Sequence, residues 1–166
     1  MGHLVGGFPF TRGEIAAEGQ ADYYATQACA RLMWQDEVET NKSFALTTSD
    51  HSRQLCGAGW DDTSGRQLCY RLHAAIEKIA DFWVWKNELD VTPSIGTPSS
   101  DVVDATITKG YPGYQCRVDT LVAGSLCLVE FDHSMRPRTY EEMSQSSCVV
   151  LDDGGARPKC WFHPSE

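Results

Sequence analysis

Three residues near the start of the chain have the types and spacing of a metal site. Glu18 follows His3 by fifteen residues, and Asp22 follows Glu18 by four. Residues four apart on a helix share one face, so Glu18 and Asp22 can act at a single site. Histidine nitrogen and carboxylate oxygen both bind zinc, and a second carboxylate can fix a ligand ring through a hydrogen bond. We expect His3 and Glu18 to be metal ligands and Asp22 to orient a ligand histidine.

The residues around His3 match the second half of a zinc-peptidase helix motif. The chain begins Met1-Gly2-His3, so a His-Glu pair directly before Met1 would complete His-Glu-x-x-His. That motif places two zinc-binding histidines on one helix face and uses the glutamate between them as general base. We therefore expect a zinc metallopeptidase-like domain whose start lies inside its own active-site helix. For the chain as written we assign no catalytic residue and predict weak or no zinc binding and no proteolysis.

Two helices are predicted to carry the candidate ligands. Residues 1–6 have the pattern of a helix end, with Gly6-Gly7 as its C-cap. Thr11-Arg-Gly-Glu14 matches a capping box, and the alanine-rich helix that it would open runs over 14–34. Gly19 costs such a helix about 1 kcal/mol relative to alanine. We interpret it as a place where a neighbouring helix or a metal site approaches closely.

The remaining segments predict further helices joined by irregular chain. Apolar residues recur at intervals of three and four over 64–88 and over 115–128, which indicates amphipathic helices. The polar segment 36–62 favours a loop or short helices, and 90–113 is rich in proline and glycine. The turn-rich tail 131–166 is expected to wrap around the helices. The fold class is therefore mainly α, with a small zincin-like helical core and disulfide-stapled loops.

Cysteine usage indicates an oxidising compartment. The chain has seven widely spaced cysteines and no Cys-x-x-Cys pair, which favours disulfides over a zinc ribbon: Cys29, Cys56, Cys69, Cys116, Cys127, Cys148 and Cys160. A Cys56–Cys69 bridge would stabilise the fold by roughly 3 kcal/mol. We expect Cys116 and Cys127 to be bridged to the tail, while the connectivity and the unpaired residue stay open. The expected location is periplasmic or secreted, with a leader upstream of Met1, since the first residues do not resemble a signal peptide.

The overall composition disfavours several classes of partner. A length of 166 residues suits one domain, which we take as residues 1–166. The formal net charge of −9 is unlike that of nucleic-acid-binding domains, which concentrate Lys and Arg on one face. The same charge disfavours an anionic membrane surface, and no apolar run approaches the roughly 18 residues of a spanning helix. We expect a peptide or protein substrate, no nucleic-acid partner and no membrane span.

Taken together, the motifs resemble a known type of enzyme. His3 with Glu18-x-x-x-Asp22 resembles the gluzincin type of zinc metalloprotease, the group that includes thermolysin. The chain is similar in more detail to a group of uncharacterised, cysteine-bearing bacterial proteins that share four of its segments: Gly2-His3 with Gly6-Gly7, Glu18 to Tyr23, Gln115 to Thr120, and Gly155 to Trp161. The resemblance spans nearly the whole chain and implies an exported zinc peptidase fold, with zinc as the cofactor. The first histidine and the glutamate base of that family's motif are absent from these residues.

Other groupings of reactive residues are weaker candidates. His51, His73, His133 and His163 are scattered singly and are expected to be surface or core residues rather than ligands. The absence of Gly-x-Ser-x-Gly from the sequence disfavours a serine hydrolase of that fold. Cys–His nucleophilic chemistry stays open, although the disulfide-like pattern argues against a catalytic thiol. Asp22 could instead be a buried acid bonded to the backbone, with no metal nearby.

The segment Gln115 to Thr120 allows a structural and a functional interpretation. Arg117 and Asp119 cannot face each other on a helix, so each is expected to reach another element and anchor this helix. In the functional alternative, Arg117 or Asp119 lies at the mouth of the site, where an arginine could stabilise an oxyanion.

Two hypotheses of different classes therefore cover the whole protein. The first is an extracytoplasmic zinc-dependent peptidase. The second is a secreted, disulfide-stapled binding or structural module that keeps a protease-like fold without its chemistry. Replacement of Glu18 separates them, because it abolishes metal binding only under the first.

Overall fold

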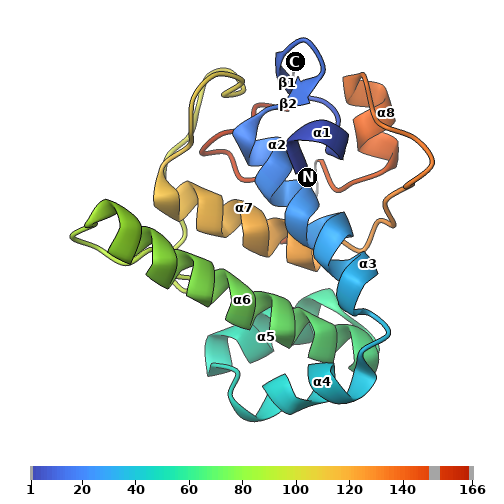
Figure 1. The fold of residues 1–166 in the computed structure, drawn as a ribbon, viewed down its shortest axis with the longest axis vertical. Coiled ribbons are helices and arrows are strands. Elements are labelled where there is room, and N and C mark those ends of the chain that lie inside the picture. The colour runs from blue at the N-terminus through green and yellow to red at the C-terminus, as the bar shows by residue number, and fades with distance from the viewer. Residues whose placement is uncertain (1, 150–153, 165–166) are drawn as a thin grey trace.

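The long helix that carries Glu18 is the central element of the fold. The computed structural model describes residues 2–149 and 154–164 and is mainly helical (Figure 1). The long helix is continuous and has three parts: α2 (Glu18–Tyr24), the π-helical η1 (Ala25–Cys29) and α3 (Ala30–Trp34). α7 (Tyr114–Leu126) packs along it, and α6 (Thr63–Asn87) packs on α7. This arrangement confirms a small, mainly helical domain.

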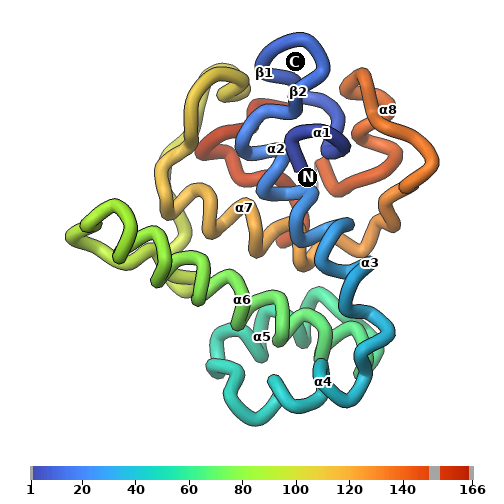
Figure 2. The backbone as a smooth tube through the Cα atoms, viewed as in Figure 1, coloured from blue at the N-terminus to red at the C-terminus, as the bar shows by residue number. Residues whose placement is uncertain are grey.

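The helices predicted from apolar spacing are confirmed with shifts of a residue or two at their ends. α6 corresponds to the predicted 64–88, and its N-cap Asp62 accepts a hydrogen bond from the Gly65 N–H. α7 corresponds to the predicted 115–128. The segment 36–62 forms short helices that pack beside α6 (Figure 2): α4 (Val38–Ser43), η2 (Phe44–Leu46) and α5 (Asp50–Gly59). Among the described residues, no helix combines the length and apolar character needed to cross a membrane.

The predicted capping box at residues 11–14 is wrong. These residues form a two-stranded hairpin of β1 (Phe10–Arg12) and β2 (Ile15–Ala16), with Gly13 at a φ of 54° in the turn. Glu14 pairs with Arg136 and Arg138 instead of a helix N-terminus. The long helix therefore begins at Glu18, whose carboxylate stands in the first turn, where the helix dipole favours a negative charge.

The N-terminal helix end and the tail complete the upper part of the molecule in Figure 1. α1 (Gly2–Val5) ends at the predicted glycine pair, and Gly7 adopts a φ of 78°. The tail contains one helix that the sequence analysis missed, α8 (Tyr140–Gln145). The Thr139 hydroxyl caps it by accepting a hydrogen bond from the Glu142 N–H.

Three disulfides hold the loops and the tail to the helices. Cys56–Cys69 joins α5 to α6, and the two ends of α7 are tied to the tail by Cys116–Cys160 and Cys127–Cys148. The expectation that Cys116 and Cys127 bind the tail is thus confirmed. Cys29 is the free thiol, and it is half-buried. Such a framework is typical of oxidising, extracytoplasmic compartments.

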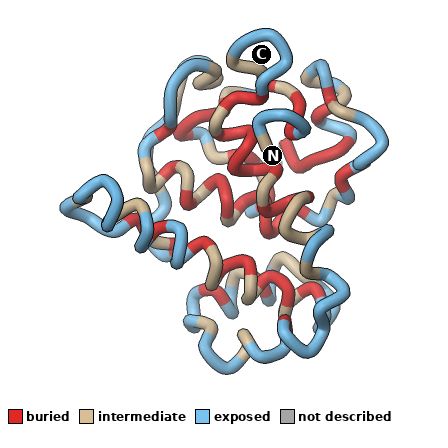
Figure 3. Tube along the Cα trace, viewed as in Figure 1, coloured by how far each residue is buried: buried red, intermediate tan, exposed pale blue. Residues whose placement is uncertain are grey.

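Trp161 of the tail explains the glycine in α2. Its side chain is fully buried and belongs to a core cluster with Cys116 of α7 and Met143 of α8. Figure 3 shows the buried segments of the chain gathered in the interior of the molecule. A Cβ at Gly19 would lie 2.3 Å from the Trp161 ring. The predicted close approach at Gly19 therefore exists, but the neighbour is an indole rather than a helix or a metal site.

Gly19→Ala is expected to lower the free energy of unfolding by about 1–3 kcal/mol, because the added methyl must displace a packed ring. The matched control is Gly57→Ala in α5, where an added Cβ meets no atom within 4 Å. Gly57→Ala is expected to raise the free energy of unfolding by up to about 1 kcal/mol, because alanine has the higher helix propensity. Guanidinium unfolding followed by tryptophan fluorescence measures both, and equal midpoints for the two variants would contradict the contact.

Candidate functional site

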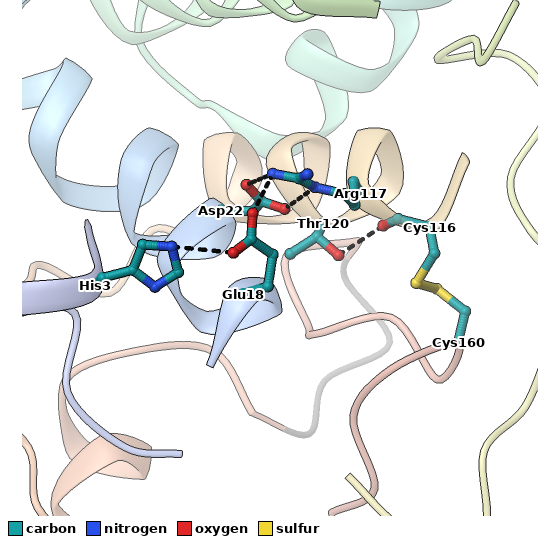
Figure 4. Close-up of polar contacts among 7 residues, drawn as sticks. All are labelled: His3, Glu18, Asp22, Cys116, Arg117, Thr120 and Cys160. Carbon is teal, nitrogen blue, oxygen red and sulfur yellow. Dashed lines mark hydrogen bonds and ion pairs between the residues drawn. A yellow bond between two sulfur atoms is a disulfide. The ribbon is translucent and has the colours of Figure 1, made fainter. Parts of the chain in front are cut away.

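His3 and Glu18 come together from two helices, as the sequence predicts (Figure 4). The distance from His3 Nε2 to Glu18 Oε2 is 3.0 Å. α1 can approach α2 this closely because its Gly2 has no side chain, and a Cβ there would lie 2.7 Å from the Ala21 carbonyl oxygen. The other ring nitrogen of His3, Nδ1, lies 2.9 Å from the Ala16 carbonyl oxygen. The ring is therefore held in one orientation, with Nε2 directed at Glu18.

The His3 ring lies between two oxygen atoms, the Ala16 carbonyl oxygen and a carboxylate oxygen of Glu18. Both ring nitrogens of His3 face an oxygen that can only accept a hydrogen bond. A neutral imidazole carries a single N–H, so it can donate to only one of these two oxygens. In the tautomer that donates from Nδ1 to the Ala16 carbonyl, Nε2 would present a lone pair toward Glu18, as a metal ligand does. His3 and Glu18 are therefore candidate metal ligands.

Arg117 binds both acidic residues of α2 from α7. Its Nη2 forms an ion pair with Glu18 Oε1 at 2.7 Å. Its Nε and Nη2 donate hydrogen bonds to the two oxygens of Asp22 at 2.7 and 2.9 Å. The guanidinium also lies 4.6 Å from the centre of the Trp83 ring. Burial raises the pKa of the Asp22 carboxyl above its usual value, although the hydrogen bonds and charge of Arg117 oppose the rise.

An open cleft gives a ligand access to the His3–Glu18 pair. Its volume is about 350 Å³, and its lining comprises His3, Leu4, Thr11, Ile15, Glu18, Gly110 and Tyr111. The side chains of Leu4, Ile15 and Tyr111 are exposed at its rim. The cleft thus combines two candidate metal ligands with apolar surface that could contact an apolar side chain of a ligand.

The other predicted site residues have different roles. The Asp22 carboxylate is held by Arg117, and no hydrogen bond joins it to a histidine in the described part of the chain. Arg117 reaches Glu18 and Asp22 on α2, and Asp119 accepts hydrogen bonds from the Ser99 N–H and the Gln115 side chain. Both residues thus anchor α7 to other segments, as the structural interpretation of Gln115 to Thr120 predicted, and neither lines the cleft. The spacing of these residues in the sequence gave no sign that Arg117 reaches Glu18.

His73 is a buried core residue rather than a metal ligand. It lies within 3.9 Å of both sulfurs of the Cys56–Cys69 disulfide, and its Nε2 is 3.1 Å from Ser125 Oγ. Cys56, Cys69 and His73 form the one group of three metal-binding residue types found among the described residues. Zinc binds cysteine as the thiolate, and both sulfurs here are used in a disulfide.

The chain matches no protein-family model, no curated protein and no solved structure.

His73 makes stability depend on pH. Burial, and to a lesser extent the charge of His51, lowers the pKa of the His73 imidazole to about 4. In the unfolded chain that pKa is near 6.5, so the unfolded state binds more protons between these two values. The contribution of His73 to the free energy of unfolding is therefore fully present above about pH 6.5 and is lost as the pH falls toward 4. Between pH 7 and pH 5 the free energy of unfolding is expected to fall by about 2 kcal/mol.

Urea unfolding at pH 7 and at pH 5 tests this expectation. His73→Gln cannot titrate in this range, so it is expected to lose less stability between the two pH values, although it starts from a lower value at pH 7. His133→Gln, at an exposed histidine, is the control and is expected to keep the pH dependence of the unmodified protein. Equal pH dependence in His73→Gln and the unmodified protein would disprove the linkage.

Proposed function

We propose that the complete protein is a zinc-dependent metallopeptidase, and that this chain holds two of its zinc ligands, His3 and Glu18. The observation that carries the proposal is the convergence of His3 Nε2 and Glu18 Oε2, at 3.0 Å, with the ring fixed through Nδ1. Two zinc ligands at about 2.0–2.1 Å from the metal in a tetrahedral site lie roughly 3.3 Å apart, close to this spacing. The donor types fit as well, since imidazole nitrogen and carboxylate oxygen both bind zinc.

Each residue has a defined role under this proposal. The Ala16 carbonyl selects the His3 tautomer that leaves Nε2 free for the metal, and Glu18 supplies one carboxylate oxygen. The cleft beside Leu4, Ile15 and Tyr111 would receive the peptide substrate. Bound zinc would supply a Lewis acid that polarises the peptide carbonyl and activates water. The resemblance to gluzincins supports a His-Glu pair directly before Met1 as the remaining ligand and the general base.

The cysteines support a location outside the cytoplasm, which we propose to be the periplasm or the extracellular space. Three disulfides connect the described part of the chain. Bridges of this kind persist where the surroundings are oxidising. A peptidase in that setting would act on exported or extracellular polypeptides.

A second candidate function is a non-catalytic, secreted binding or structural module. The observation that favours it is the charge balance of the site. With a protonated His3, the ring and Arg117 together neutralise Glu18 and Asp22 without a metal. Under this alternative the cluster would hold α1, α2 and α7 together, and the disulfides would serve the same end.

Zinc titration of a protein with His-Glu joined to Met1 tests the first proposal. That protein is expected to bind one zinc ion at least about a hundredfold more tightly than the chain beginning at Met1, because it gains a ligand. It is also expected to cleave a fluorogenic peptide in a reaction that a chelator stops. Glu18→Ala in the same protein is expected to weaken zinc binding at least about a hundredfold. Removing a residue that only orients a ligand usually weakens metal binding about 10- to 100-fold, and removing a ligand itself is expected to cost more.

Glu14→Ala is the matched control for Glu18→Ala. Glu14 is an acidic residue four positions before Glu18 in the sequence. It pairs with Arg136 and Arg138, away from the site. It is expected to leave zinc affinity unchanged within twofold. Zinc binding that survives Glu18→Ala as well as Glu14→Ala would reject Glu18 as a ligand and favour the non-catalytic module.

A further inference from the structure

The two oxygens of the Glu18 carboxylate have different partners. Oε2 faces His3 Nε2 at 3.0 Å, and Oε1 forms an ion pair with Arg117 Nη2 at 2.7 Å. A carboxylate can bind a metal through one oxygen or through both. With Oε1 ion-paired to a guanidinium, Oε2 is the oxygen that Glu18 presents toward His3. Arg117 thus determines how many oxygens Glu18 presents.

Arg117 is itself held in one position by contacts on several sides. Its Nε and Nη2 form a two-bond fork with the Asp22 carboxylate, the geometry in which a guanidinium is most strictly oriented. The flat face of the group is packed against Trp83 of α6, and Tyr111 lies 5.7 Å away. The side chain of Arg117 is 14% exposed. It is a rigid donor rather than a mobile surface charge.

The spacing in α2 makes this arrangement possible. Glu18 and Asp22 are four residues apart, so both carboxylates lie on the helix face that meets α7. Without a cation between them, two partly buried carboxylates on one face would repel each other and turn away. Arg117 provides that cation from the first turns of α7 (Figure 4).

From these contacts we infer that Arg117 is the positioning residue of the zinc site, which holds Glu18 as a one-oxygen ligand with Oε2 directed at His3. The inference rests on the proposed function and assigns Asp22 its part. Asp22 fixes Arg117 by the fork, and Arg117 fixes Glu18. The acid four residues after the ligand therefore acts on the metal through an arginine of another helix.

The test compares Arg117→Gln and Arg117→Lys in the protein with His-Glu joined to Met1. Zinc affinity is measured by competition with a chromophoric chelator, and Co²⁺ is used as a second probe because its visible absorption reports the coordination geometry. Arg117→Gln is expected to weaken zinc binding about 10- to 100-fold, the usual effect of removing a group that orients a ligand. Arg117→Lys keeps the charge without the fork, so an intermediate affinity and an altered Co²⁺ spectrum are expected.

The matched control is Arg71→Gln. Arg71 is also an arginine that pairs with an acid, Glu37, and packs against an aromatic ring, Trp34, but it lies at the α4–α6 contact. It is expected to keep zinc affinity within twofold and the Co²⁺ spectrum unchanged. A merely structural role for Arg117 would lower the melting temperature as Arg71→Gln does, without moving the spectrum.

The possible outcomes separate the two claims. If the unmodified extended protein binds no zinc, the proposed function fails and this inference fails with it. If it binds zinc tightly and both Arg117 variants do so equally with the same Co²⁺ spectrum, the function stands and the positioning role is rejected. Should Arg117→Gln not fold, Arg117→Lys decides alone, and an unchanged affinity and spectrum would reject the role.

Discussion

The fork between Arg117 and Asp22 is the contact on which the arrangement of the helices around the candidate site depends. It joins α2 to α7 through two short hydrogen bonds in a partly buried position. Removing one partner of such a pair leaves the other charge uncompensated, which costs far more than an exposed ion pair would. The same guanidinium forms an ion pair with Glu18, so one side chain links the contact between the two helices to the geometry of the site.

Neighbouring residues of α2 connect it to the other motifs of the sequence. The Gln20 amide donates to the Gly6 carbonyl, and its oxygen accepts two hydrogen bonds from the buried Arg157 of the tail. The Tyr23 hydroxyl donates to the Gly155 carbonyl oxygen. The N-terminal helix end and the tail thus meet around one helix.

The sequence predicted the positions of the helices better than it predicted which side chains contact one another between them. The pattern Thr-x-x-Glu occurs both at 11–14, where it forms a hairpin turn, and at 139–142, where it caps α8. Gly13 accounts for the difference, because a glycine two residues after the cap weakens a helix and permits the left-handed turn. His3 and Glu18 could be paired from their types and spacing. Arg117 could not be assigned to Glu18, since its direction on α7 depends on how two helices pack.

The π-helical turn η1 places three contacts of the long helix on one stripe along α7. Asp22 binds Arg117, the Thr26 hydroxyl donates to the Leu121 carbonyl, and Arg31 donates to the carbonyls of Gly124 and Ser125. The step from Asp22 to Thr26 is four residues, as in an α-helix, whereas the step from Thr26 to Arg31 is five, as in a π-turn. In a homologue that lacks one residue within 25–29, the second and third contacts would also be four residues apart. A regular α-helix would then place all three contacts on the same stripe. We therefore expect this turn to tolerate a gap in evolution, while the interval from Glu18 to Asp22 keeps a fixed length.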